Sequence, residues 1–181
     1  MLIHPQKSCL LVVDIQEKLV PAIYQKEALV KNSKWLIEIA NILNVPVLTS
    51  EQYPQGLGHT LEELKAVLPA EGFMEKTHFS CAAEPACSEM INAQGLAQVV
   101  IIGMEAHVCV LQTAMQLKQQ ARDVFVVADC VSSRSPEDKA LALERMRSCG
   151  IHIVSREMVA FEWMQKSGTD AFKKISKEYL R

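Results

Sequence analysis

Six short apolar runs, separated by longer stretches, constrain the fold of this chain more than any other feature of its sequence. The runs cover residues 10–13, 45–50, 72–76, 99–102, 124–128 and 151–154. Short apolar runs that alternate with helical stretches are typical of parallel strands covered on both faces. The sequence therefore predicts an α/β chain. We expect a single three-layer αβα domain over residues 1–181, with a mostly parallel, Rossmann-like sheet of about six strands.

The stretches between the runs carry helix signals. One apolar stripe has the i, i+3, i+4, i+7 spacing of a helix face: Leu36, Ile39, Ala40 and Leu43. Ser135 followed by a proline and two acidic residues predicts the N-terminus of another helix. Residues 156–181 favour two helices separated at 167–170, the second capped by Thr169 or Asp170. These helices are expected to pack on the sheet or on a neighbouring subunit.

Composition excludes several classes of function. The formal net charge is −2, with 22% charged and 49% hydrophobic residues, which is typical of a folded protein and gives no reason to expect a nucleic acid partner. No apolar run approaches the roughly 20 residues needed to cross a membrane. The N-terminal residues lack the pattern of a secretory signal, so a cytoplasmic location is expected.

The cysteines do not form a metal or disulfide pattern. The six are scattered, without a CxxC pair, at positions 9, 81, 87, 109, 130 and 149. Free cysteine is usually a small buried hydrophobe, and we expect that role for every one except Cys109.

Three polar residues that follow or end predicted strands are candidates for catalysis. In open parallel sheets, ligands bind at the carboxyl ends of the strands. Asp14 ends the first run, Lys76 ends the third, and Cys109 follows the fourth. An acid, a base and a thiol are therefore expected to meet at one edge of the sheet.

The chemistry of these groups is complementary. Residues after Cys109 have helical spacing, which places the thiol in or near a first helical turn, where the helix dipole and Lys76 should lower its pKa. Asp14 would accept the thiol proton during attack. Each residue also has a structural interpretation, because an aspartate after a strand often caps a helix and a lysine is usually solvated.

Three segments resemble the isochorismatase-like hydrolase family: residues 13–16, 75–80 and 103–109. The similarity runs from Ser8 to about Phe161 and is closest to a subgroup of isochorismatase domain-containing proteins. The resemblance implies that Asp14, Lys76 and Cys109 form a catalytic triad. It also implies hydrolysis of a small C–N, amide-type substrate through a thioester, without a cofactor.

The resemblance implies further features near the cysteine. A cis peptide bond is expected between Met104 and Glu105. It would direct the backbone N–H groups of Glu105 and Cys109 at a developing oxyanion.

Other positions bear on metal and substrate. Nicotinamidases of the family carry an aspartate-x-histidine metal motif that residues 49–59 lack, so we expect no catalytic metal and interpret His59 as a surface or pocket residue. Four residues near strand ends are candidates for the substrate pocket, with Phe79 equally compatible with the core: Gln16, Tyr53, His78 and Phe79.

Two other functions stay open at this point. Isochorismatases proper cleave a vinyl ether by proton transfer, for which Asp14 would be essential and Cys109 dispensable. Alternatively, the chain is a catalytically silent oligomeric scaffold. A small-molecule substrate and a homo-oligomer are the expected partners.

Overall fold

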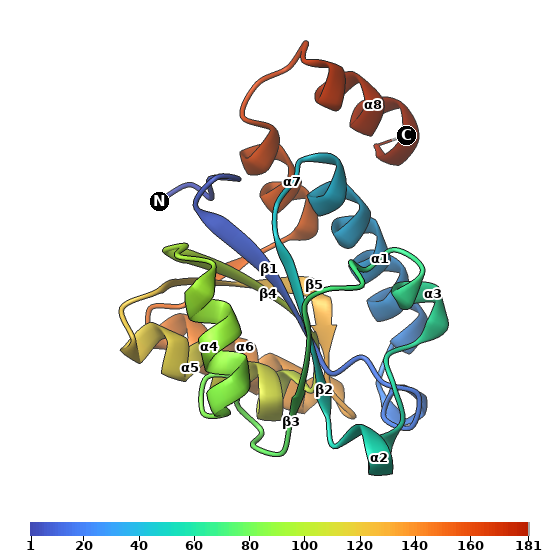
Figure 1. Cartoon of the computed structure of the whole chain (residues 1–181), viewed down its shortest axis with the longest axis vertical. Helices are drawn as coiled ribbons and strands as arrows, with labels where there is room; N and C mark the ends of the chain where they lie inside the picture. The colour runs from blue at the N-terminus through green and yellow to red at the C-terminus, as the bar shows by residue number, and fades with distance from the viewer. Residues whose placement is uncertain (181) are drawn as a thin grey trace.

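The computed structural model describes residues 1–180 and contains one six-stranded sheet (Figure 1). The strands are β1 Ser8–Val13, β2 Val47–Gln52, β3 Phe73–Lys76, β4 Gln98–Met104, β5 Asp123–Ser132 and β6 His152–Val154. Their order is β3-β2-β1-β4-β5-β6, and every neighbouring pair is parallel. The predicted fold class is confirmed. Arg181, included in the predicted domain, lies outside the described residues.

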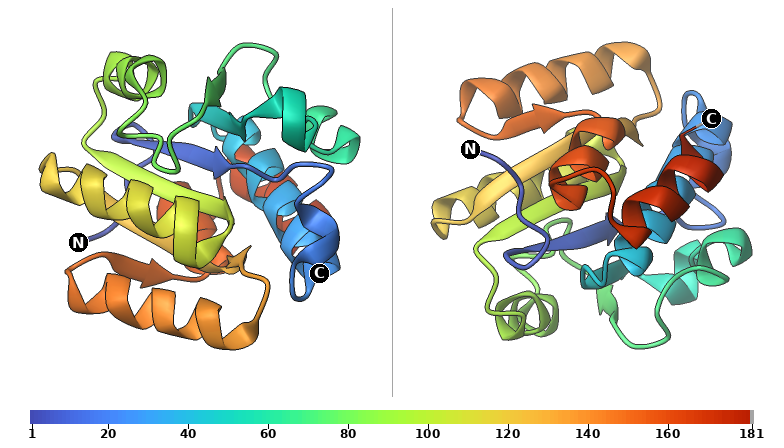
Figure 2. Two further views of the ribbon diagram at one scale, coloured as in Figure 1. Left: turned by 90° about the horizontal axis from the view of Figure 1, so that it is seen from below. Right: turned by 90° about the horizontal axis from the view of Figure 1, so that it is seen from above.

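Helices cover both faces of the sheet (Figure 2). They are η1 Val20–Ala22, α1 Lys26–Ile42, α2 Pro54–Leu57, α3 Glu62–Lys65, α4 Pro85–Ala93, the π-helix η2 Ala106–Val110, α5 Leu111–Gln119, α6 Pro136–Ser148, α7 Arg156–Met164 and α8 Asp170–Tyr179. In the part of the chain from Met1 to Leu180, no helix is both long and apolar enough to span a membrane.

Successive strand side chains point to opposite faces of the sheet and form two apolar cores. Leu10 and Val12 of β1 pack in one cluster with residues of α1 and α7. Leu11 and Val13 point the other way, into a cluster with residues of α4, α5 and α6. Because successive strand side chains point to opposite faces, an entirely buried strand serves both cores.

All six strands have bounds that differ from the predicted runs, and the physical reason is clear for β2 and β5. Strand β2 was expected at residues 45–50 but begins after Pro46, which has no N–H to give to the ladder, and continues to Gln52. Strand β5 was expected to end at Ala128 but reaches Ser132, because an irregularity in its register against β4 lets the ladder resume beyond the polar Asp129.

The helix N-caps predicted from the sequence are present, whereas one cysteine differs from its predicted burial. The Ser135 hydroxyl accepts a hydrogen bond from the Asp138 N–H at 3.1 Å, and Thr169 caps α8. Trp163 of α7 is 2% exposed and packs within this chain. Cys149 was expected to be buried but is exposed, because it lies just beyond the end of α6.

Gly103 permits the close approach of β1 and β4 at the centre of the sheet. Its φ is +115°, and a Cβ atom there would lie 2.1 Å from the Val13 carbonyl oxygen. Real Cβ atoms do not approach backbone atoms so closely, so any side chain would force the two strands apart.

We predict that Gly103→Ala lowers the free energy of unfolding by more than about 3 kcal/mol, because backbone strain and an overlap with Val13 add together. Gly168→Ala is the matched control. Its φ is also positive, at +84°, but nothing lies within 4 Å of its Cβ position. The control should cost only about 1 kcal/mol. Urea unfolding measures both, and equal losses would contradict the packing argument.

Candidate active site

The expected residues meet at the carboxyl edge of the sheet. Asp14 follows β1, Lys76 ends β3, and the loop with Cys109 follows β4. Strands β1 and β4 are neighbours in the sheet, and the order of strands reverses between them. Such a switch point is where open α/β sheets form their crevice.

Lys76 and Asp14 form a buried ion pair. The distance between Lys76 Nζ and Asp14 Oδ2 is 2.7 Å, and both side chains are 0% exposed. Lys76 also donates to Gln52 Oε1 at 2.6 Å. Burial of each charge is costly, so the pair persists because each ion has a partner and further hydrogen bonds.

Asp14 is held from both sides of its carboxylate. Its Oδ1 accepts from the Ser50 hydroxyl at 2.7 Å, while Oδ2 faces Lys76. The backbone is fixed as well: the Asp14 N–H donates to the Ser50 carbonyl, and φ is +51°. The carboxylate therefore does not cap the following segment, which was the structural interpretation of this residue.

Cys109 lies in the π-helix η2, immediately before α5. The residue is 7% exposed, so the thiol is covered but not sealed from the surface. The Met104–Glu105 peptide bond that precedes this helix is cis. Cys109 is thus near the N-terminus of α5, although the turn that carries it is wider than an α-helical turn.

The electrostatics of the thiol differ from the sequence prediction. Burial, and next the negative charge of Asp14, raise the pKa of Cys109, while Lys76 opposes them. We predicted a lowered pKa from the helix and Lys76 alone. The prediction was wrong because it left out burial, which is the largest effect, and the charge of Asp14, which outweighs that of Lys76. Cys109 rests as a protonated thiol.

The pKa values of the ion pair follow from the same surroundings. Burial raises the pKa of Asp14, with Lys76 and the Ser50 hydroxyl acting against it. Burial by itself would lower the pKa of Lys76, but the negative charge of Asp14 and its hydrogen bond to the amine raise it. Lys76 therefore stays a cation, and Asp14 becomes a better proton acceptor than an exposed aspartate.

The cysteine loop is fastened to the end of β5. Arg134 Nε donates to Glu105 Oε2 at 2.8 Å. His107 Nδ1 lies 3.0 Å from the Ser133 hydroxyl. These contacts tie the side chains on both sides of residue 106 to the segment that follows β5.

The four expected pocket residues are placed differently from one another. Gln16 is fully buried, and its side-chain amide bonds the Gln52 backbone and the Gly58 carbonyl, so it braces loops. Tyr53 is 53% exposed and Phe79 54%, which removes Phe79 from the core. The His78 ring is exposed and bonded to Glu84.

Sequence reasoning missed Ser50, Gln52 and Glu84. Ser50 and Gln52 touch the ion pair directly. The usable signal was their position, since polar residues that end a buried parallel strand face the crevice. Glu84 left no such signal, because it bonds Thr77 and His78 across a loop.

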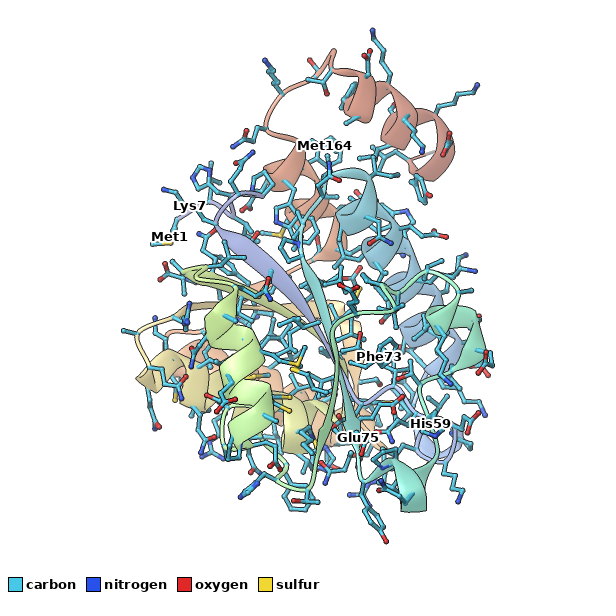
Figure 3. The ribbon with its side chains drawn as sticks, in the orientation of Figure 1. Met1, Lys7, His59, Phe73, Glu75 and Met164 are labelled. Atoms are coloured by element: carbon cyan, nitrogen blue, oxygen red, sulfur yellow. The ribbon has the colours of Figure 1, made fainter. Side chains whose placement is uncertain are left out.

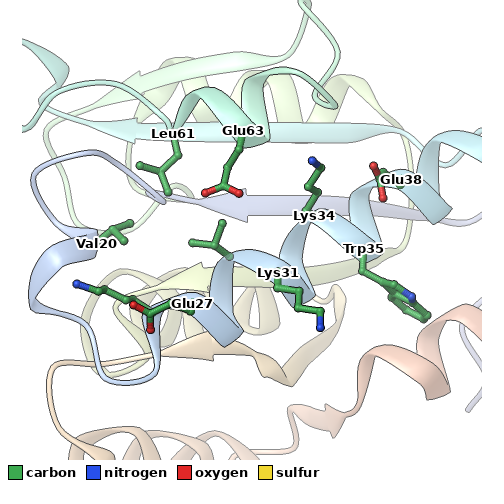
Figure 4. A pocket seen from close by; sticks show the side chains of 10 residues that line it. Val20, Glu27, Lys31, Lys34, Trp35, Glu38, Leu61 and Glu63 are labelled. Carbon is green, nitrogen blue, oxygen red and sulfur yellow. The ribbon is translucent and has the colours of Figure 1, made fainter. Parts of the chain in front are cut away.

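A wider cavity lies away from these residues. A groove of about 540 Å³ runs along α1, with Val20, Trp35 and Leu61 among its lining residues (Figure 4). It contains none of Asp14, Lys76 and Cys109. A hollow of about 130 Å³ borders Lys76, lined also by Tyr53 and Glu84. Neither Asp14 nor Cys109 lines this hollow.

His59 lies on the loop after α2 (Figure 3). Its Nδ1 is 2.9 Å from Glu51 Oε2. Among residues 1–180, no three His, Cys, Asp or Glu side chains are grouped so that they could hold a metal ion.

Comparison with known proteins identifies the family of the chain. The isochorismatase domain matches residues 8–158. Isochorismatase domain-containing protein 2 of Danio rerio is 39% identical, covering 94% of this chain and 85% of the relative. Isochorismatase family protein 1B of Dictyostelium discoideum is 36% identical, covering 96% and 86%. The structure of the MAR1 ribonuclease from Caenorhabditis elegans superposes with a TM-score of 0.93 at 36% identity, covering 100% and 93%. The chain belongs to the isochorismatase family and is a hydrolase of that family.

Proposed function

We propose that this chain hydrolyses a small amide-type C–N bond through a thioester on Cys109, with Asp14 and Lys76 completing the catalytic group. The buried Lys76–Asp14 pair at 2.7 Å, beside the thiol at the switch point of the sheet, carries the proposal. A carboxylate that is held ionised next to a protonated thiol is arranged to accept one proton.

The first half of the reaction breaks the amide. Cys109 Sγ attacks the carbonyl carbon while its proton passes to Asp14. The C–N bond then breaks, and the leaving amine takes the proton from Asp14. We propose that the N–H groups of Glu105 and Cys109 donate to the oxyanion. The product on the enzyme is a thioester.

The second half restores the thiol. Water loses a proton to Asp14 and attacks the thioester carbon, and the C–S bond breaks. The sulfur recovers the proton from Asp14, and a carboxylic acid leaves. Lys76 keeps its charge throughout and offsets the charge of Asp14 whenever the carboxylate is ionised. No cofactor takes part in this sequence.

The surroundings favour a small substrate. Cys109 is 7% exposed, so a bulky group cannot reach the sulfur without displacing side chains. Tyr53 and Phe79 offer exposed aromatic surfaces beyond the strand ends, and His78 offers a polar ring. We propose these three as contacts for the part of the substrate distant from the reacting carbonyl. A homo-oligomer and a cytoplasmic location stay predictions.

Ribonuclease activity is a second candidate, because the Caenorhabditis elegans protein described as a ribonuclease is 36% identical over the whole chain. The formal charge of −2 and a lysine already paired with Asp14 are unfavourable for a polyanion. Incubation with labelled single-stranded RNA decides this. Cleavage that survives removal of Cys109 would replace the amidase proposal.

We predict that Cys109→Ala abolishes turnover of every amide that the protein hydrolyses, a loss of at least about 1,000-fold. A panel of small primary amides, followed by ammonia release, supplies the substrate. p-Nitrophenyl acetate should leave an acetyl group on Cys109, detected by intact mass. Cys149→Ala is the control, because that thiol is exposed and distant in sequence from the site. Full amide turnover in Cys109→Ala would reject the thioester, and a vinyl ether hydrolysis that survives in this variant would favour the non-covalent alternative. No turnover in any variant would favour a scaffold.

We predict that Asp14→Asn and Lys76→Met shift the alkylation of Cys109 in opposite directions. Asp14 raises the pKa of the thiol and Lys76 lowers it. Loss of the carboxylate should therefore move the midpoint of alkylation to lower pH, and loss of the cation should move it to higher pH, each by about one unit.

The measurement is the rate of iodoacetamide alkylation against pH, with Cys149 as the reference thiol in the same sample. Each variant breaks a buried ion pair, at a cost of about 3 to 5 kcal/mol, so circular dichroism must first show that it is folded. Shifts in the same direction would contradict the proposed charges.

A further inference from the structure

Glu84 occupies the position before α4 but turns away from that helix. Its Oε2 accepts hydrogen bonds from the Thr77 N–H at 3.0 Å and the His78 N–H at 3.3 Å. The same oxygen lies 3.0 Å from His78 Nδ1 and 3.4 Å from the Thr77 hydroxyl. One carboxylate oxygen thus gathers the first two residues of the loop that follows β3.

The other side of this loop holds Lys76. The ammonium group donates to the Phe79 carbonyl at 3.0 Å and lies 3.3 Å from the His78 carbonyl. Together with Asp14 and Gln52, these carbonyls give four acceptors for the three protons of the amine. The direction of Lys76 Nζ therefore depends on where the loop carries its carbonyls.

Two other bonds fix the loop at its flanks. Gln52 Nε2 donates to the Thr77 carbonyl at 2.8 Å. The Cys81 N–H donates to the Thr113 hydroxyl at 3.0 Å, which joins the far end of the loop to α5. The Glu84 carboxylate is the ionised hydrogen-bond acceptor for the N–H groups of this loop. Its bonds to backbone N–H groups are charge-assisted and therefore stronger than neutral ones.

We infer that Glu84 is a positioning residue of the active site, which holds the loop at Thr77 and His78 so that the carbonyls of His78 and Phe79 keep the Lys76 ammonium on Asp14. The inference rests on the proposed function for its catalytic meaning, but the positioning of Lys76 can be measured without turnover. The His78 ring, followed by the two N–H groups, lowers the pKa of Glu84 to about 2, so the carboxylate is ionised at every pH at which the enzyme is assayed.

Reaction of Lys76 with sulfo-NHS-acetate, followed by peptide mass mapping, tests the inference. In the unaltered protein the amine is buried and should react slowly. Glu84→Gln loses the charge that orders the loop, and Lys76 acetylation should rise about tenfold relative to an exposed lysine such as Lys173. Glu89→Gln is the matched control, because it removes the same charge from an exposed position on α4.

His78→Ala provides an independent variant if Glu84→Gln fails to fold. It removes one partner of Glu84 and leaves the carboxylate, so the rise in Lys76 acetylation should be smaller, about threefold. The double variant should add little to Glu84→Gln, since both substitutions remove the same contact. Lys76 reactivity in both single variants within twofold of Glu89→Gln would overturn the inference.

Turnover separates this inference from the proposed function. With an amide substrate in hand, Glu84→Gln should lower kcat about tenfold and leave KM within twofold, because Glu84 acts through Lys76 and is not among the proposed substrate contacts. An equal loss in Glu89→Gln would reject the inference. If the unaltered protein hydrolyses no amide, the proposed function fails, and acetylation of Lys76 still decides the role of Glu84.

Discussion

The ion pair between Lys76 and Asp14 is the interaction on which the rest of the site depends. Two fully buried charges are tolerable only when each satisfies the other and the remaining hydrogen-bonding capacity is used. That requirement accounts for the Ser50 hydroxyl on one side and the Gln52 amide on the other. Burial of the Cys109 thiol, and next the negative charge of Asp14, raise the pKa of that thiol, and Lys76 only partly opposes them.

Most of the fold could be predicted because its signals are local. A run such as residues 10–13 is apolar throughout and has a single explanation, a strand buried on both faces. Ser135 identifies its helix start by chemistry that acts over three residues. The predicted bounds were wrong where contacts between residues distant in sequence determine the structure. Strand β5 continues past Asp129 because β4 offers a partner there, and the sequence near Ala128 does not contain that information.

The residues of the site also differ in whether local sequence signals can identify them. Asp14, Lys76 and Cys109 follow strand ends and match family segments, so a sequence can nominate them as catalytic. Glu84 belongs to the next helix, and only the folded loop brings its carboxylate to Thr77 and His78. The sign of the Cys109 pKa shift was missed for a related reason. The direction of the shift depends on burial of the thiol and on the Asp14 charge, which outweighs that of Lys76, and both arise only when separate segments pack together.

The close contact of Gly103 with Val13 bears on how such a site can diversify. Because no side chain fits between β1 and β4, the floor of the crevice has a fixed width, and Asp14 and the cysteine loop keep a constant separation. A larger or differently shaped substrate cannot be accommodated by spreading the sheet. To change the substrate specificity of this enzyme, the strands should therefore be left intact. The surface loops that carry Tyr53 and Phe79 should be varied instead, because these exposed side chains contribute little to the core.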